Sequence, residues 1–408
     1  MTRTYPSRDA TRPLSAVSAD SSTAALELSV VMPCLNEADT LAVCIDKARR
    51  AMDAHGIAGE VVVADNGSTD GSPDIARAHG ARVVTVSERG YGAALMGGIA
   101  AAHGTFVIMG DADDSYDFAE VPRILTKLRE GFDLVQGCRL AAGGGQVMPG
   151  AMPFLHRWWG NPMFSSMARL WFKAPIHDIH CGMRGFRRDA WRRLDQRCTG
   201  MEFASEMVIK ASVHGFRIAE VPIVLRPDGR ANGRSHLRTF RDGWRHLRFF
   251  LMFSPRWLFL LPGMLLILLG IAGYAVAMPG LSFGRVGFDV HTLLFASLAI
   301  ICGYQAIVFA VFTKAFAINE GLLPADERMR MLFRYVTLER GVLLGGISLL
   351  LGTILLLGAV MQWGAAHFGA LDVRHTMRWA IPGMTLAVIG VQTVFSSFFL
   401  SILGMKRL

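Results

Sequence analysis

Two aspartates one residue apart are the strongest candidate for chemistry in this sequence. Asp111 and Asp113 follow the apolar run 106–109 (FVIM) and a glycine. Carboxylate oxygens are the ligands that Mg²⁺ and Mn²⁺ prefer, and Mg²⁺ shares its coordination with substrate phosphates. We therefore predict that Asp111 and Asp113 bind Mg²⁺ or Mn²⁺. The alternative is a pair of solvated acids in a turn.

Two further polar clusters end apolar runs upstream. One is 33–37 (PCLNE), at the end of the run 28–33, and the other is 65–70 (DNGSTD), after the run 60–64. In a parallel α/β sheet, ligands bind at the carboxyl ends of the strands, so the three clusters should meet in one crevice. The Asp65 carboxylate is suited to accept hydrogen bonds from a nucleobase N–H or a ribose hydroxyl. Alternatively, Asp65 caps its own turn.

The elements that position these clusters alternate between strand and helix. Apolar runs predict strands at 28–33, 60–64, 81–86 and 106–109, and helical patterns at 38–55, 72–79 and 92–103 lie between them. Continuous apolar strands separated by helices indicate a mostly parallel, Rossmann-like sheet that is covered on both faces. The predicted fold class is therefore α/β for the N-terminal part of the chain.

The C-terminal part has the composition of a membrane domain. The chain is 52% hydrophobic, and uncharged stretches cover about 258–278, 292–313, 341–361 and 380–405. Each stretch is long enough to cross a bilayer as a helix, so we predict four transmembrane helices. The segments before the first span, between spans two and three, and after span four hold most of the flanking Lys and Arg residues. The positive-inside rule then places the N-terminal domain in the cytosol of a multi-pass protein of the inner or plasma membrane.

The remaining segments complete a division into four parts. Residues 1–26 have the composition of a disordered tail, 27–235 form the α/β domain, 236–256 a juxtamembrane segment, and 257–408 the membrane domain. The juxtamembrane segment alternates Arg with Trp, Leu and Phe, which predicts an amphipathic helix at the cytosolic interface in contact with membrane lipids. The net charge of +9 is not concentrated in a tract typical of nucleic-acid binding, so we expect no nucleic-acid partner.

Several strings together resemble a known family. The stretches 30–37 (VVMPCLNE), 65–70 (DNGSTD), 90–95 (GYGAAL) and 111–113 (DAD) look like family-2 glycosyltransferases of the GT-A fold. More narrowly, with 137–139 (GCR), 181–186 (CGMRGF) and 230–235 (RANGRS), the chain resembles the polyprenyl-phosphate glycosyltransferases, including dolichyl-phosphate mannose or glucose synthases. The resemblance covers about residues 28–255. It implies a nucleotide-sugar donor and a polyprenyl-phosphate acceptor.

The resemblance also implies roles for single residues. The nucleotide-sugar contacts would be Pro33, Asn36, Glu37, Asp65, Ser68, Asp111 and Ser235, and the metal site Asp111 with Asp113. Arg139 and Arg230 would clamp the acceptor and donor phosphates. Two positions depart from the family: Ser115 stands where Gln is frequent, and His236 stands where Lys is usual.

A buried acid and a histidine-rich string complete the candidates. Glu206 lies in the apolar stretch 201–211, and we expect it to orient Arg184 or Arg230 and so to take part in catalysis. The string 177–181 (HDIHC) would need a second cluster of ligands to hold zinc, so Asp178 is better interpreted as ordering an acceptor-site loop. Trp158 and Trp159 fit either an interfacial anchor or the core.

These features predict a membrane-anchored, inverting hexosyltransferase. A phosphate acceptor is already substantially dianionic at pH 7 and needs charge neutralisation and positioning more than a strong base. The alternatives are a processive polysaccharide synthase of the same fold, whose usual Gln-x-x-Arg-Trp string is missing from this sequence, or a non-catalytic membrane scaffold or lipid carrier. The identity of the sugar and the formation of a homo-oligomer stay open.

Overall fold

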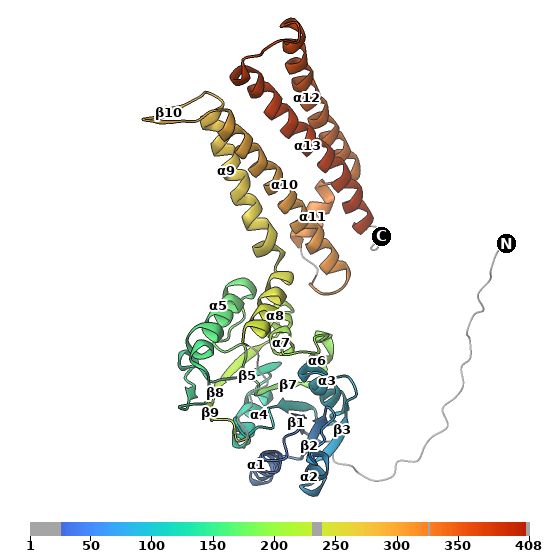
Figure 1. Ribbon diagram of the computed structural model, residues 1–408. Helices are drawn as coiled ribbons and strands as arrows, with labels where there is room; N and C mark the ends of the chain where they lie inside the picture. The colour runs from blue at the N-terminus through green and yellow to red at the C-terminus, as the bar shows by residue number, and fades with distance from the viewer. Residues whose placement is uncertain (1–25, 231–238, 325–326, 405–408) are drawn as a thin grey trace, which may run out of the picture.

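The computed structural model describes residues 26–230, 239–324 and 327–404. An N-terminal α/β domain lies below a group of long helices that forms the C-terminal half (Figure 1). Seven strands make the central sheet: β1 Leu28–Cys34, β2 Gly59–Asp65, β3 Arg82–Thr85, β4 Phe106–Met109, β5 Leu134–Cys138, β7 Arg184–Arg187 and β8 Ile218–Pro222.

The strand order determines which loops share an edge of the sheet. The order is β3-β2-β1-β4-β7-β5-β8. All neighbouring pairs are parallel except those of β7, which runs antiparallel to both β4 and β5. Arg184, the first residue of β7, therefore pairs with Met109, the last residue of β4. The loop that enters β7 consequently lies at the same edge as the carboxyl ends of the parallel strands.

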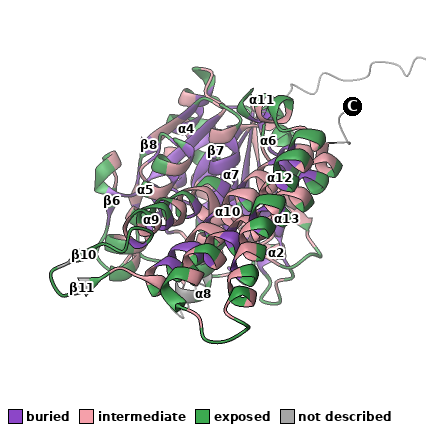
Figure 2. Cartoon of the chain, turned by 90° about the horizontal axis from the view of Figure 1, so that it is seen from above, coloured by how far each residue is buried: buried purple, intermediate pink, exposed green. Residues whose placement is uncertain are grey.

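Helices cover both faces of the sheet, as the alternation of strands and helices predicts. Along β1, Val30 and Met32 contribute to one core cluster and Val31 to the other, because successive side chains of a strand point to opposite faces. The first cluster includes residues of α1 (Leu41–Ala54) and α4 (Val121–Arg129). The second includes residues of α3 (Tyr91–Ala101), α5 (Asn161–Phe172), α7 (Phe203–Val213) and α8 (Thr239–Met252). Figure 2 shows the buried residues concentrated around this sheet.

Short elements fill the connections. They are α2 Ser72–Ala78, α6 Arg188–Leu194, the 3-10 turns η1 Phe118–Glu120 and η2 Ala141–Gly143, the π-helical turns η3 His156–Gly160 and η4 Arg256–Leu260, and the strand pairs β6 Gln146–Val147 with β9 Val224–Leu225 and β10 Ser282–Phe283 with β11 Val286–Gly287.

Within the described residues, four helices are long and apolar enough to cross a membrane, in agreement with the predicted number. They span Arg256–Ala277 (η4 with α9, Leu261–Ala277), Val290–Asn319 (α10), Leu338–Ala365 (α12) and Val373–Gly404 (α13), with α11 (Glu327–Tyr335) between the second and the third. Small residues bring α12 and α13 close together. A Cβ atom on Gly345 would lie 2.8 Å from the Gly390 carbonyl oxygen, and one on Gly352 would lie 2.6 Å from that of Gly383. Such small-residue contacts are typical of helix packing in lipid.

The junction between the two parts combines both kinds of packing. The predicted juxtamembrane helix is present as α8, and its Phe249 and Phe250 are buried in the α/β core, whereas Trp244 stays exposed. Helix α8 therefore contacts the domain through one face, in addition to any contact with lipid. Trp171 at the end of α5 stacks on Trp257 at the start of the first span, with ring centroids 5.3 Å apart. This contact fixes α5 beside the membrane end of the domain.

Candidate active site

The first two polar clusters form one continuous surface at the carboxyl ends of β1 and β2. The backbone N–H of Asn36 donates to Ser68 Oγ at 2.9 Å, and Asn36 Oδ1 accepts from the backbone N–H of Thr69 at 2.8 Å. The N–H of Glu37 donates to Ser72 Oγ at 3.0 Å. Asn36 adopts a left-handed φ of 59°, a conformation that Asn tolerates better than most residues. Its local hydrogen bonds hold the two loops in register.

Asp65 is buried at the end of β2, and its carboxylate accepts the backbone N–H groups of Gly67 and Ser68, both at 3.2 Å. The turn-capping alternative for Asp65 is therefore present in the structure. Its predicted contact with a nucleotide stays a prediction. Pro33 lies within β1, one residue before its end.

Asp111 lies between a tyrosine and a glycine. The Tyr91 hydroxyl donates to Asp111 Oδ1 at 2.8 Å, and a Cβ atom on Gly182 would lie 2.6 Å from Asp111 Oδ2. Burial, and then the neighbouring Asp113 carboxylate, raises the pKa of Asp111 to about 7. An ionised carboxylate held in such a place gains from a nearby cation.

Asp113 has its two oxygens in different surroundings. Oδ1 accepts both the backbone N–H of Ser115, at 3.1 Å, and the Ser115 hydroxyl, at 2.6 Å. Oδ2 lies 3.7 Å from Nη1 of Arg230. Ser115, at the position where the resemblance expects Gln, thus orients Asp113 in this structure.

The two aspartates fit a hard divalent cation that completes its coordination elsewhere. Both offer carboxylate oxygens, and a side chain at position 182 would clash with Oδ2 of Asp111. Within 26–230, 239–324 and 327–404 no group of three or more His, Cys, Asp or Glu side chains could hold a metal by itself. Mg²⁺ is commonly held by one or two carboxylates plus substrate phosphates and waters, so this donor set suits it.

Arg230 connects the first cluster with the third. Its Nε donates to Glu37 Oε2 at 2.7 Å, its Nη2 pairs with Glu37 Oε1, and its Nη1 donates to Asp228 Oδ2 at 2.6 Å. Burial would lower the pKa of Arg230, but the hydrogen bond and the charge of Glu37 outweigh it and raise that pKa. Ser235, predicted beside Arg230, lies outside the described residues.

Arg139 and Asp178 form a buried ion pair at the end of β5. Asp178 Oδ2 accepts from Arg139 Nε at 2.7 Å and from its backbone N–H at 3.0 Å, and Oδ1 accepts from Nη2 at 2.9 Å. The remaining nitrogen, Nη1, lies 3.3 Å from the Tyr116 hydroxyl, which also accepts the Gly182 N–H at 2.8 Å. Tyr116 thus links Arg139 to the glycine that faces Asp111. Burial opposes the charge of Arg139, but Asp178 raises its pKa well above the ordinary value.

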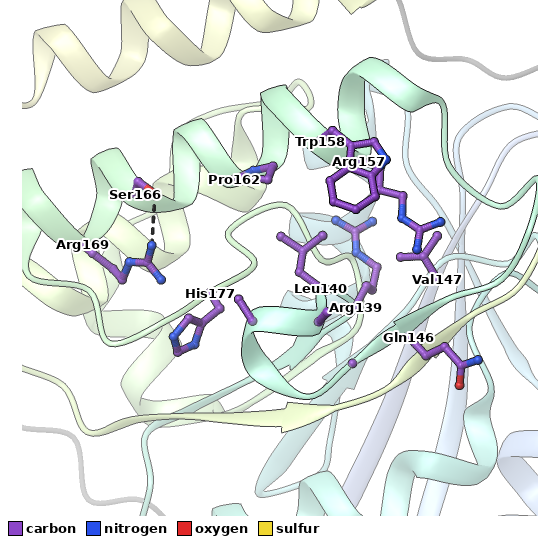
Figure 3. A pocket seen from close by; sticks show the side chains of 13 residues that line it. Arg139, Leu140, Gln146, Val147, Arg157, Trp158, Pro162, Ser166, Arg169 and His177 are labelled. Carbon is purple, nitrogen blue, oxygen red and sulfur yellow. Dashed lines mark hydrogen bonds between the residues drawn. The ribbon is translucent and has the colours of Figure 1, made fainter.

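Arg139 also lines a cavity of about 350 Å³ (Figure 3). Its lining includes Arg139, Arg157, Arg169 and His177, together with Trp158 and the 140–147 loop. The Arg157 guanidinium lies over the Trp158 ring, 5.4 Å from its centroid. Three arginines around one cavity make it suited to an anionic ligand.

Glu206 does not contact Arg184 or Arg230, the residues that we expected it to orient. Its carboxylate pairs with Lys210 at 2.8 Å and accepts the backbone N–H groups of Arg197 and Cys198 at 2.8–3.1 Å. Arg184 is fully buried and donates to backbone carbonyls, including those of Cys181 and Ala204. The apolar surroundings of Glu206 indicate burial correctly, but the carboxylate holds a loop and touches neither arginine that we expected.

Among the described residues, the histidine-rich string belongs to no group of three or more His, Cys, Asp or Glu side chains that could hold a metal. His177 Nδ1 lies 2.7 Å from Glu220 Oε2, and the backbone N–H groups of His177 and Asp178 donate to Glu220 Oε1. Glu220 on β8 and the Arg139 pair thus order the loop that enters β7, as expected for Asp178, while a role of this loop in binding the acceptor stays a prediction.

Tyr91, Tyr116 and Arg157 did not emerge from the sequence as site residues. Tyr91 lies within the string Gly90-Tyr91-Gly92, where a bulky phenol between two glycines at a helix start was the available signal. Tyr116 and Arg157 gain their roles only from contacts with residues distant in sequence. No local pattern specifies such contacts.

Comparison with known proteins adds an independent line of evidence. Residues 29–195 match the model of glycosyl transferase family 2, and residues 311–404 match that of the glycosyltransferase family 2 C-terminal transmembrane region. The low-salt glycan biosynthesis hexosyltransferase Agl6 of Haloferax volcanii is 38% identical over 95% of this chain and 91% of its own. A dolichyl-phosphate hexose transferase of the same organism is 34% identical over 53% of this chain and 89% of its own.

Among solved structures, glucosyl-3-phosphoglycerate synthase of Mycobacterium tuberculosis in complex with Mn²⁺, UDP and glucosyl-3-phosphoglycerate is 23% identical, with a TM-score of 0.45 over 56% of this chain and 80% of that chain. The two family matches and the similarity to a hexosyltransferase over nearly the whole length show that the chain is a multi-pass membrane enzyme and belongs to glycosyltransferase family 2.

Proposed function

We propose that this enzyme transfers a hexose from a nucleoside-diphosphate sugar to a polyprenyl phosphate at the cytosolic face of the membrane, with inversion at the anomeric carbon. One observation carries the proposal. Arg139 lines the cation-lined cavity beside α5. It is also linked to the Asp111 side of the site, because its Nη1 contacts the Tyr116 hydroxyl, which accepts the N–H of Gly182. An anionic acceptor in that cavity would thus lie next to the donor site.

The donor half consists of the three loops at the carboxyl ends of β1, β2 and β4. Glu37, Asp65 and Ser68 would supply polar groups for the nucleoside, as the resemblance implies. Asp111 and Asp113 would hold Mg²⁺ or Mn²⁺, and when bound this cation neutralises charge on the diphosphate leaving group. Arg230 Nη1 lies 3.7 Å from Asp113 Oδ2, so Arg230 is placed to contact the same diphosphate.

The acceptor half combines positive charge with an exposed apolar surface. Arg157 and Arg169 line the cavity, and large apolar side chains beside it are exposed, among them Phe154, Trp159 and Leu170 at about 70%. Trp171, next to Leu170 on α5, stacks on Trp257 of the first span, which supports a position of this surface near the membrane. A lipid phosphate fits both features: its headgroup suits the arginines and its chain suits the apolar surface.

The chemistry required of the protein is positioning. An acceptor phosphate oxygen attacks the anomeric carbon, its new C–O bond forms as the bond to the nucleoside diphosphate breaks, and the electron pair leaves with the diphosphate. A phosphomonoester is largely dianionic at pH 7, so no general base is required. Arg139 would hold the nucleophile, and Asp178 holds Arg139 in a fixed orientation. A single displacement of this kind inverts the anomeric configuration.

The basic flanks of the membrane helices support a cytosolic site. Arg256 precedes the first span, and Lys314, Arg330, Arg334 and Arg340 lie between the second and third spans or at their ends. The opposite connections hold far fewer basic residues. The name of the Haloferax dolichyl-phosphate hexose transferase agrees with a lipid-phosphate acceptor.

A transfer assay tests the proposal. Membranes that contain the full chain are incubated with Mg²⁺, polyprenyl phosphate and labelled UDP-glucose or GDP-mannose, and the label in the lipid fraction is measured. Asp113→Ala should abolish transfer. Asp114→Asn is the control, because this neighbouring acid pairs with Lys47 at 2.6 Å. Arg157→Gln should raise the KM for polyprenyl phosphate while leaving the KM for the donor unchanged.

The outcomes separate the alternatives. Label in products that lengthen with time would favour a processive polysaccharide synthase. No transfer from any common nucleotide-sugar to polyprenyl phosphate would refute the lipid acceptor. Full transfer by Asp113→Ala would refute the metal assignment.

A further inference from the structure

One guanidinium is shared by three carboxylates at the junction of the donor loops. Arg230 pairs through two nitrogens with Glu37 and through Nη1 with Asp228, and the same Nη1 lies 3.7 Å from Asp113 Oδ2. The side chains are largely shielded from water, with 18% of Arg230 and 7% of Glu37 exposed. Charges in such surroundings interact more strongly than charges at an open surface.

The position of Nη1 matters because Asp113 has only one oxygen that Ser115 does not use. Ser115 donates twice to Oδ1. Oδ2 is therefore the oxygen best placed to bind a cation, and it is the oxygen that faces Arg230. A divalent cation at Oδ2 would lie close to a second positive charge. An arginine cannot relieve that repulsion by losing a proton, so the guanidinium would have to move.

A diphosphate offers Arg230 a different partner. Phosphate oxygens accept the paired N–H groups of a guanidinium as well as a carboxylate does. A diphosphate that contacted Arg230 would draw the guanidinium away from Asp113 and Glu37. Glu37 would then lose this pairing with Arg230, and its predicted role is to contact the nucleoside.

We propose that Arg230 competes with the divalent cation for Asp113, and that the diphosphate of the donor ends this competition by taking over Arg230. The inference rests on the proposed function, because it requires both a cation and a nucleoside diphosphate at this site. Cation and nucleotide then bind cooperatively: each removes part of the cost of binding the other, and the coupling is equal in both directions. Arg230 holds the cation site in check in this scheme until it contacts the diphosphate, and its pairing with Glu37 weakens its attraction to Asp113.

Binding of Mn²⁺ to the full-length protein tests the inference without an activity readout. The free ion is followed by electron paramagnetic resonance in detergent or nanodiscs, with and without UDP or GDP. Wild type should bind Mn²⁺ more tightly when the matching nucleotide is present. Arg230→Gln should bind Mn²⁺ about tenfold more tightly than wild type without nucleotide, since a nearby positive charge is gone. It should gain much less from the nucleotide.

Two further variants sharpen the test. Arg226→Gln is the matched control: Arg226 lies in the same segment but pairs with Asp117 at 2.7 Å, so this variant should behave as wild type. Glu37→Gln has the opposite expectation from Arg230→Gln. It removes the main partner of Arg230 and leaves Asp113 as a stronger attraction, so Mn²⁺ binding without nucleotide should weaken. The sign of this effect keeps the test decisive even when Arg230→Gln fails to fold.

The outcomes distinguish this inference from the proposed function. Mn²⁺ binding that weakens in Arg230→Gln both with and without nucleotide, or that strengthens in Glu37→Gln, would overturn the inference while transfer by wild type persisted. Failure of wild type to bind Mn²⁺ with either nucleotide, together with no transfer, would overturn the proposed function and the inference with it.

Discussion

Replacement of Asp178 by Asn tests whether the buried pair with Arg139 organises the acceptor side. Asp178 is completely buried and receives three hydrogen bonds from Arg139. Asn keeps one acceptor oxygen, but its amide N–H₂ would face another donor, and the Arg139 charge would lose its counter-ion. Removal of one partner of a buried ion pair costs about 3–5 kcal/mol. For a domain of this size, about 3 kcal/mol corresponds to a fall in melting temperature of about 6–12 °C.

The assay is thermal unfolding of the full-length protein in detergent, followed by intrinsic fluorescence. Asp189→Asn is the control, because Asp189 also pairs with an arginine, Arg187, but at the surface, where such pairs contribute at most about 1 kcal/mol. The double variant Arg139→Met with Asp178→Asn should recover at least half of the lost stability, since the unpaired charge is gone, yet it should remain inactive. A double variant as unstable as the sum of both single changes would refute the reasoning. So would an Asp178→Asn variant with the melting temperature of wild type.

Three other expectations follow from the site. Gly182→Ala places a methyl group 2.6 Å from Asp111 Oδ2, so we expect at least about tenfold weaker Mn²⁺ binding in the presence of UDP or GDP, measured by paramagnetic resonance; unchanged binding would contradict this. Burial, and then the charge of His246, lowers the pKa of His180 well below 6.5. Below that pH, His180 therefore binds a proton in the unfolded chain but not in the folded chain. Stability should therefore fall by up to about 1.4 kcal/mol per pH unit below 6.5, and melting curves of His180→Phe at pH 5–7 should lose this part of the slope; an unaltered slope would refute the assignment. EDTA should stop sugar transfer by wild type and added Mn²⁺ or Mg²⁺ should restore it, whereas persistent transfer in EDTA would exclude a role for the cation.

Much of the fold could be predicted because its strands and membrane spans are visible as apolar runs in the local sequence. The apolar runs that became β1, β2 and β4 end at polar clusters, and the parallel arrangement brings those ends together. The four spans are similarly evident from length and composition alone, although the helices extend beyond the uncharged stretches. The helix expected from residue 38 begins at Leu41, since residues 37–40 form a turn with hydrogen bonds from Thr40 and Leu41 to the Glu37 carbonyl.

Other features depend on contacts that no local pattern encodes. Strand β7 has the sequence RGFR, which carries no apolar run, and it is a strand because β4 and β5 both offer it backbone partners. Glu206 pairs with Lys210, four residues later on the same helix, which helical spacing could have indicated, whereas its identity as an acid does not indicate its other partners, the backbone N–H groups of Arg197 and Cys198. Trp158 and Trp159 fitted either the core or an exposed surface, and the structure leaves both exposed.

The place of β7 has a consequence for how the domain is assembled during synthesis. Strands β4 and β5 do not pair with each other, and β7 alone joins the half-sheet β3-β2-β1-β4 to the half-sheet β5-β8. Asp111 belongs to the first half, and Arg139 follows the second. The ribosome must therefore release Arg184–Arg187 before the two halves can dock. Native-state hydrogen exchange should show that the domain opens along these four residues, with the loop of Asp111 on one side and Arg139 on the other.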